Sequence, residues 1–408
     1  MRIRSITYFI DPAMGELDDQ FSITYAHSRS AQAALEKAGF EVQSIRLATS
    51  PFPTWLPLAD KQISQTKIEE LAARAEKNGF DYLSLGPCSF HTDQEVEDLI
   101  PRFLSSTESI FITMPITTSH QISLQDVHSS ARVISHVAAL SEDGFGNLRF
   151  AALANVAPFT PFFPAAYGAA GEIAFAIAME CADSAIIAFQ AAPDIRHGCQ
   201  HMRAEFETKA AQIEKILAQL DNGNNLQFKG FDFSLAPYPE EWCSFGKALE
   251  SMGITAIGSA GSLAAASILA GTLDQGTWRK AGFNGLMMPI LEDAILAQRS
   301  GDGILSVYDV LQYSSVCGTG LDTIPLPGEI SSEKIAALLL DIAALSLRLD
   351  KPLTARLMPI PGKVAGEEIE FDFSFFSKGR VLDFPYQGIQ PPLTVGDYLS
   401  INPRPIIR

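Results

Sequence analysis

The chain has 408 residues, of which 47% are hydrophobic and 19% are charged, and its mean hydropathy is +0.12. This composition is sufficient for a large hydrophobic core and argues against a disordered chain. The formal net charge of −17 and the lack of a Lys/Arg cluster argue against nucleic acid as a partner, because a phosphate backbone requires a basic surface.

In chain order, residue patterns predict alternating strands and helices. The expected strands are 2–9, 41–48, 81–85, 109–114, 148–153, 185–190, 230–235, 356–360 and 368–373. The expected helices are 20–38, 63–78, 92–104, 124–140, 170–181, 201–220, 240–252, 263–270, 289–298 and 332–349.

This alternation is typical of an α/β fold with a parallel sheet or barrel. Nearly continuous apolar runs at 109–114 and 185–190 favour strands that are covered on both faces. The chain could hold several average domains, but no linker or change in composition divides it. We therefore expect one α/β domain over residues 1–408, with more than eight strands.

The five cysteines are scattered and form no CxxC pair, so we expect reduced thiols and a cytoplasmic protein. The start of the chain lacks the features of a signal peptide. Charged residues interrupt the apolar stretches 165–192 and 335–349, so we expect a soluble protein with no membrane partner. Self-association into a homo-oligomer is compatible with the apolar composition.

The stretch YSSVCGTGLDTIPLPG at 313–328 combines a thiol, glycines, threonines and a carboxylate. Backbone N–H groups of Gly318, Thr319 and Gly320 could form a nest for an anion. Cys317 beside such a nest could be a nucleophile with a lowered pKa. Alternatively, Cys317 is a small buried residue in a tight loop.

Asp322 and Thr323 follow at once, and Asp322 could act as an acid or base, bind a metal, or only hydrogen-bond its own turn. Upstream, Glu292 and Asp293 fall in the first turns of the helix predicted from residue 289, where the helix dipole favours acidic residues. Together with Asp322 they could instead form an oxygen-rich site for Mg²⁺ or Ca²⁺.

Three cationic residues lie in KPLTARLMPIPGK at 351–363. Lys351 and Lys363 are compatible with a solvated surface, whereas Arg356 interrupts an apolar run and is expected to be buried and paired. Its planar guanidinium could hold a carboxylate or phosphate.

Arg46 lies near the end of a predicted strand, before Thr49 and Ser50. Loops that follow parallel strands gather at one end of an α/β barrel, where ligand sites usually form. We therefore expect Arg46 to contribute to a ligand site. The sequence contains no P-loop, no GxGxxG after a strand and no GxSxG elbow.

The segments IRLATSPFP, PFFPAAY, GLMMPILEDAILA, YSSVCGTGLDTIPLPG and KPLTARLMPIPGK resemble, in this order, those of the uncharacterised family called domain of unknown function 711. The resemblance implies a single large α/β domain with a ten-stranded barrel similar to that of pyruvate formate-lyase. It implies no reaction. A glycyl-radical loop of the RVxGY type is missing, and TVGDY at Gly396 does not match it, so we do not expect radical chemistry.

Two hypotheses follow. The first is an enzyme that acts on a small anionic metabolite in the barrel interior, with Cys317 or Asp322 as the catalytic group. Gly318, Thr319, Gly320, Thr323, Arg46 and Arg356 would bind the ligand. The second is a metabolite-binding or regulatory protein that performs no reaction.

Overall fold

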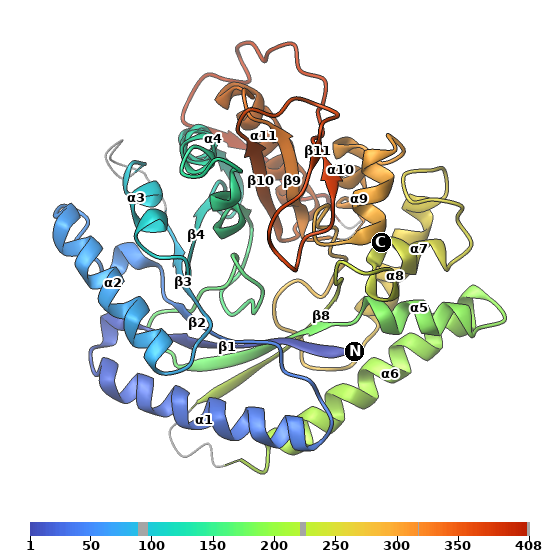
Figure 1. Cartoon of the computed structure of the whole chain (residues 1–408), viewed down its shortest axis with the longest axis horizontal. Coiled ribbons are helices and arrows are strands. Elements are labelled where there is room, and N and C mark those ends of the chain that lie inside the picture. Colours follow the sequence, from blue (N-terminus) through green and yellow to red (C-terminus); the bar gives the residue numbers. More distant parts are fainter. Residues whose placement is uncertain (89–96, 221–225, 317, 406–408) are drawn as a thin grey trace.

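The computed structural model describes residues 1–88, 97–220, 226–316 and 318–405, and in this part of the chain nine strands form one curved sheet (Figure 1). The strand order is β8-β7-β1-β2-β3-β4-β6-β10-β9. These strands are β1 (Arg2–Ile10), β2 (Ile45–Thr49), β3 (Tyr82–Pro87), β4 (Ile110–Pro115), β6 (Phe150–Ala154), β7 (Ala174–Glu180), β8 (Gln227–Ala236), β9 (Gly320–Pro327) and β10 (Leu353–Ile360).

The sheet is mixed rather than fully parallel. The five central strands β1, β2, β3, β4 and β6 run parallel to one another. The strand pair β7 and β8 is antiparallel to β1, and the pair β10 and β9 is antiparallel to β6. The start of β9 therefore lies near the carboxyl end of the central strands.

Helices cover the outer side of the sheet (Figure 1). They are α1 (Leu17–Lys37), α2 (Lys61–Lys77), α3 (Leu99–Ser106), α4 (Leu124–Ala138), α5 (Ala182–Gln190), α6 (Ile195–Leu217), α7 (Phe245–Glu250), α8 (Ser262–Asp274), α9 (Ala294–Gly301), α10 (Val307–Tyr313) and α11 (Ser332–Leu349). None of these helices is long and apolar enough to cross a membrane. Two small antiparallel pairs complete the fold: β5 (Gln121–Ser123) with β13 (Tyr398–Ser400), and β11 (Glu368–Ile369) with β12 (Gly379–Arg380).

The loop of residues 155–173 fills the concave side of the sheet. The Thr7 hydroxyl donates to the Pro161 carbonyl at 2.8 Å, and the Ser84 hydroxyl donates to the Ala166 carbonyl at 2.6 Å. Small strand residues such as Ala174 leave room for this loop and pack with its aromatic side chains. The loop and these strand residues therefore pack together on the concave side of the sheet.

The segment of residues 279–291 lies between the two edge strands and hydrogen-bonds to both. On the β8 side, the Phe231 amide donates to the Arg279 carbonyl at 2.8 Å. On the β9 side, the Ile290 amide donates to the Asp322 carbonyl at 3.1 Å. The segment thus connects the two ends of the curved sheet.

Asp232 of β8 secures this segment. Its carboxylate accepts the Phe283 and Asn284 amides and also the amide and hydroxyl of Ser234. Burial raises the pKa of Asp232 to about 6, although these donors act in the opposite direction.

The α/β class expected from the sequence is confirmed, and β1, β3, β4, α1, α2 and α11 lie close to their predicted positions. A closed barrel of ten strands is not found, because in the described residues the large sheet has nine strands and ends at β8 and β9. Two neighbouring predictions are exchanged: residues 174–180 form β7 instead of a helix, and residues 182–190 form α5 instead of a strand.

The start of α9 and the whole of β9 also differ from prediction. Helix α9 begins at Ala294 rather than near Pro289, so Asp293 is its N-cap and Glu292 precedes it. Residues 320–327, which contain Pro325 and Pro327 and were not among the expected strands, form β9. The strand β9 lies at the end of the sheet order, so one of its sides has no neighbouring strand to which backbone N–H groups must donate. Two prolines, which lack this N–H group, are therefore compatible with the strand.

Candidate functional site

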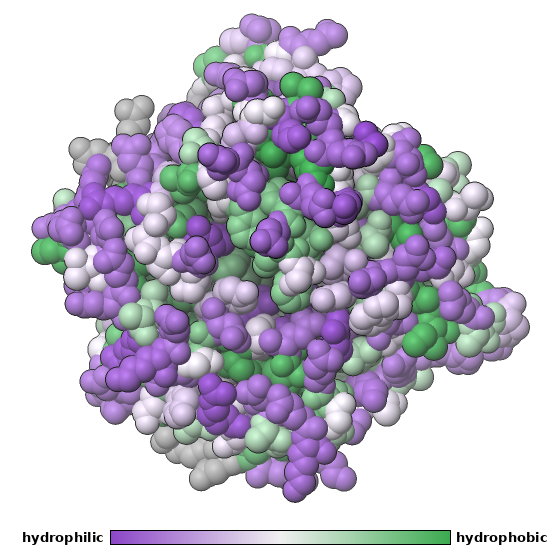
Figure 2. All heavy atoms as spheres, viewed as in Figure 1, coloured by the Kyte–Doolittle hydropathy of each residue, from purple (hydrophilic) through white to green (hydrophobic). Residues whose placement is uncertain are grey.

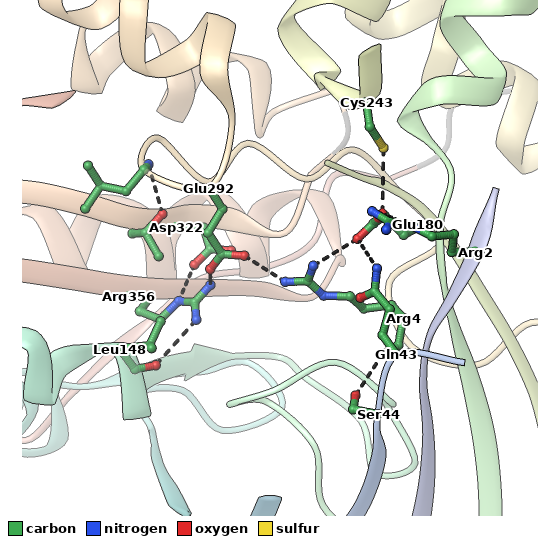
Figure 3. Close-up of polar contacts among 12 residues, drawn as sticks. Arg2, Arg4, Gln43, Ser44, Leu148, Glu180, Cys243, Glu292, Asp322 and Arg356 are labelled. Carbon is green, nitrogen blue, oxygen red and sulfur yellow. Dashed lines mark hydrogen bonds and ion pairs between the residues drawn. The ribbon is translucent and has the colours of Figure 1, made fainter. Parts of the chain in front are cut away.

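A cluster of arginines and carboxylates lies inside the curved sheet, contributed by segments that are far apart in the chain (Figure 3). We call it the arginine–carboxylate cluster. Its members are Arg2, Arg4, Arg46, Glu180, Glu292, Asp322 and Arg356.

Arg356 of β10 binds two of the carboxylates. Its Nε donates to Asp322 Oδ1 at 2.5 Å and its Nη2 donates to Glu292 Oε1 at 2.7 Å. Burial disfavours the charged guanidinium, but the two carboxylates outweigh this effect and raise the pKa of Arg356 above its usual value. Arg356 is only 6% exposed, so the prediction of a buried, paired arginine is confirmed.

Arg4 joins the two sides of the cluster. It donates to Glu180 Oε2 at 3.0 Å and to Glu292 Oε2 at 3.1 Å. Glu180 also accepts from Arg2 and, at 2.9 Å, from Gln43 Nε2. Figure 3 shows this continuous chain of contacts from Arg356 to Arg2.

Bulges in two strands aim these side chains inward. Arg4 lies at a register shift in β1, between Ile3 and Ser5 where they pair with β7. Asp322 and Thr323 of β9 both lie opposite Arg356 of β10, so β9 contains an extra residue at this point. Bulges re-aim side chains and are common beside active sites.

The bulge in β9 is strained. Thr323 is fully buried and has a φ of 41°, a left-handed conformation that a β-branched residue rarely adopts. Its hydroxyl accepts a hydrogen bond from the Leu291 amide at 3.3 Å, which connects the bulge to the segment of residues 279–291. Strain of this kind persists where the surrounding structure fixes the backbone, and it is frequent at functional sites.

Arg46 of β2 differs from the other arginines of the cluster. Its Nε donates to Ser44 Oγ at 2.9 Å, and in the described part of the chain it forms no ion pair with a carboxylate. Its guanidinium carbon lies 5.5 Å from the ring centre of Tyr82 and 5.2 Å from that of Phe163. The side chain remains partly exposed.

The surroundings of Arg46 make its positive charge unfavourable. Burial, followed by repulsion from Arg4, lowers the pKa of Arg46 to about 10. A guanidinium in such a position is stabilised by an anion that approaches from outside the protein.

The glycine-rich turn at 318–320 is engaged in backbone pairing. The Thr319 amide donates to the Leu286 carbonyl at 3.1 Å, and the Thr319 carbonyl accepts the Thr354 amide. Gly320 has a φ of 101°, and an added Cβ there would lie 2.0 Å from the Thr354 carbonyl oxygen. Close contact between β9 and β10 is therefore sufficient to explain Gly320, and Gly318 is buried beside it.

The three carboxylates predicted as a metal site take different roles. Glu292 and Asp322 accept from Arg356, whereas Asp293 accepts the Ile295 and Leu296 amides at the start of α9. Burial raises the pKa of Asp293 to about 6. Within the described residues, no group of three His, Cys, Asp or Glu side chains is arranged to hold a metal ion.

Cys317 lies outside the described residues. Of the other cysteines, Cys88, Cys181 and Cys243 are buried, and burial raises the pKa of each thiol, in Cys243 to about 12. Thiols with raised pKa values are poor nucleophiles at neutral pH.

A groove of about 600 Å³ lies on the outer surface between α6 and α8. It is lined by residues that include Arg196, Cys199, Arg203, Ile268 and Gly271. No member of the arginine–carboxylate cluster lines it, so this groove and the charged interior are separate features.

A protein-family model described as "Uncharacterised ACR (DUF711)" matches residues 1–377. The chain belongs to this family. It is similar to a UPF0210 protein of Pyrobaculum arsenaticum, with 28% identity over 357 residues that cover 83% of this chain and 78% of the relative. A UPF0210 protein of Oenococcus oeni is 28% identical over 369 residues, which cover 83% and 81% of the two chains. These names state no reaction and no ligand.

All members of the arginine–carboxylate cluster fall within the part of the chain that matches the DUF711 family. Sequence reasoning identified Arg46, Glu292, Asp322 and Arg356 but missed Arg2, Arg4 and Glu180. A signal for the missed residues was present, because Arg2 and Arg4 alternate at the start of an apolar strand and Glu180 ends the apolar run of β7. Charged residues in buried strands are expected to be paired.

The cluster does not lie where the sequence placed the ligand site. Arg2 and Arg4 are near the start of β1, and Arg46 is the second residue of β2. The charged groups therefore lie toward the amino ends of the central strands, whereas loops at the carboxyl ends were expected to form the site. At the carboxyl ends, Asp11 accepts the Ser50 hydroxyl and the Gly171 amide, which fixes the loop 155–173 there.

Proposed function

We propose that the protein binds a small anionic molecule inside the curved sheet, with the guanidinium of Arg46 as the main anchor. One observation carries the proposal: Arg46 lies in the arginine–carboxylate cluster without a carboxylate partner among the described residues, whereas Arg2, Arg4 and Arg356 each have one.

The energetics of buried charges support this assignment. A guanidinium that is partly removed from water is stabilised by a counter-charge. A bound anion would supply that counter-charge at Arg46. Arg356 is already bonded to Asp322 and Glu292, so in this proposal it holds the carboxylates of the site in place.

Replacing Arg46 by methionine tests the proposal. We expect sodium acetate to raise the melting temperature of the wild-type protein saturably, compared with sodium chloride at equal ionic strength. A ligand at a hundred times its Kd stabilises by about 2.7 kcal/mol. In the Arg46→Met variant this increase should disappear, while the ligand-free melting temperature should stay the same or rise because an unpaired charge is removed.

Arg196→Met is the matched control, since Arg196 is an exposed arginine in the outer groove. It should retain the full effect of the anion. Loss of the effect in Arg196→Met and not in Arg46→Met would place the anion in the outer groove and refute the proposal.

We also propose that the segment 279–291 acts as a tenth, irregular strand that closes the sheet into a barrel. Its hydrogen bonds to Phe231 of β8 and from Ile290 to β9 support this interpretation, as does the carboxylate of Asp232. Closure would set the arginine–carboxylate cluster in a barrel interior, as the family resemblance implies. The four described cysteines are free thiols, which supports a cytoplasmic location.

An enzyme is the second candidate, and the strained backbone at Thr323 favours it. In this proposal either Cys317, as a nucleophile, or Asp322, as an acid or base, would act on the bound anion. The function would then be a reaction on the anion instead of binding alone.

Labelling with iodoacetamide at neutral pH tests the nucleophile, with Cys199 as an internal reference because it is partly exposed. Mass mapping should show labelled Cys317 before Cys199, and little label on buried Cys88 and Cys243, whose thiol pKa values are raised by burial. If Cys317 reacts more slowly than Cys199, it is not an activated thiol.

A further inference from the structure

We infer that the anion held at Arg46 is a monocarboxylate that carries an apolar group, and not a phosphate or sulfate. This inference rests on the proposed function and specifies its ligand class. Three features of the arginine–carboxylate cluster support it: its charge balance, the remaining donors of Arg46, and the aromatic side chains beside this residue.

The charge balance of the cluster requires one negative charge. Its four arginines face three carboxylates, those of Glu180, Glu292 and Asp322. Two further carboxylates lie near the cluster, Glu41 beside Arg2 and Asp81 near Arg46, but both are exposed to solvent. One bound monoanion would neutralise the cluster, whereas a dianion would leave a second negative charge in a region that disfavours unpaired charge.

The donors that remain on Arg46 suit a carboxylate. Its Nε donates to Ser44 Oγ, and its Nη1 and Nη2 donate to no residue in the part of the chain that the structure describes. Two parallel N–H donors match the two oxygens of a carboxylate in a bidentate arrangement. Phosphate can accept the same pair, so this feature alone does not choose between the two anions.

The aromatic surroundings favour the carboxylate. Tyr82 and Phe163 lie beside the guanidinium, and the ring of Phe111 is 5.4 Å from Tyr82 and 5.2 Å from Phe163. The nearby strand residue Ala48 belongs to the same apolar cluster. Apolar walls stabilise an apolar substituent and do not replace the hydration that a phosphate or sulfate loses.

Figure 2 shows the face of the molecule seen in Figure 1, with purple hydrophilic residues over much of its area and green hydrophobic residues visible between them. Mixed surfaces of this kind do not select a particular anion. Selection would therefore come from Arg46 and the rings beside it.

Calorimetric titration of the wild-type protein tests the inference with five probes at constant ionic strength and pH 7.5. The probes are sodium acetate, sodium benzoate, benzamide, sodium phosphate and sodium sulfate. We expect benzoate to bind at least tenfold tighter than phosphate, sulfate and benzamide, and tighter than acetate. Arg46→Lys, which keeps the charge but loses the planar fork, should weaken benzoate binding at least tenfold.

The outcomes separate this inference from the proposed function. If phosphate or sulfate binds as tightly as benzoate and depends on Arg46, the carboxylate class is wrong and the anion site stands. If acetate binds as tightly as benzoate, the inference that the ligand carries an apolar group is wrong. If no anion shows binding that depends on Arg46, both the inference and the proposed function are refuted.

Discussion

Replacing Arg356 by methionine is expected to lower the free energy of unfolding by about 3–5 kcal/mol, the usual effect of removing one partner from a buried ion pair. Stability is lost because the variant leaves two carboxylates without their cationic partner. Asp322 and Glu292 both accept from Arg356, and their side chains are only 13% and 11% exposed, so water replaces the guanidinium poorly.

Urea-induced unfolding followed by circular dichroism measures this effect. Arg380→Met is the control, because Arg380 pairs with Glu368 on the surface and such pairs contribute about 0–1 kcal/mol. Adding Asp322→Asn to Arg356→Met should recover part of the loss, since it removes one unpaired carboxylate. Equal effects of Arg356→Met and Arg380→Met would show that the cluster does not stabilise the fold.

Replacing Gly320 by alanine is expected to lower the free energy of unfolding by roughly 3–5 kcal/mol, in the range that marks a specific structural conflict. Gly320 has a φ of 101°, and an added Cβ would lie 2.0 Å from the Thr354 carbonyl oxygen of the paired strand. Because the obstacle is backbone, β9 and β10 would have to separate where they position Asp322 and Arg356.

Gly271→Ala is the matched control for Gly320→Ala. Gly271 lies within α8, and an added Cβ there has no atom within 4 Å. Alanine in a helix is more stable than glycine by about 0.8–1.0 kcal/mol, so this variant should be stabilised. Thermal and urea unfolding should therefore show effects of opposite sign. If Gly320→Ala leaves the free energy of unfolding unchanged, close strand pairing does not explain the glycine at this position.

The parts of the fold that the sequence predicts correctly are those with clear periodicity and caps. Helix α11 was predicted over its full length, because its apolar stripe follows the polar cap at Ser331. β7 was missed because both of its faces are buried: small residues such as Ala176 face the interior loop, and larger ones such as Ile177 face the helices. When both faces of a strand are apolar, its sequence lacks the alternation of hydrophobic and polar residues from which strands are predicted.

The site was predictable only in part, for a related reason. Arg356 interrupts an apolar strand, and this indicated a buried partner. Its partners Asp322 and Glu292 were identified as a possible metal site instead, because spacing along the chain does not reveal that a bulge in β9 and the segment before α9 meet at β10. Long-range strand pairing decides which charges meet, and neither the pairing of β1 with β7 nor that of β9 with β10 is marked by a local motif.

The arginine–carboxylate cluster also changes the role of the YSSVCGTGLDTIPLPG stretch. Gly320 allows close strand pairing, Asp322 completes the partners of Arg356, and Thr323 holds the bulge. This stretch therefore positions charged side chains, and the proposed contact with the ligand is made from β2 by Arg46.

The most direct test of the central claim, that Arg46 anchors an anion in the interior of the sheet, is a crystal structure with sodium 4-bromobenzoate. Anomalous scattering from bromine locates the ligand independently of its refined pose. We expect one bromine peak beside Tyr82 and Phe163, with the carboxylate on the Nη atoms of Arg46. Bromine peaks that occur only on the outer surface, or a map without any peak near Arg46, would contradict it.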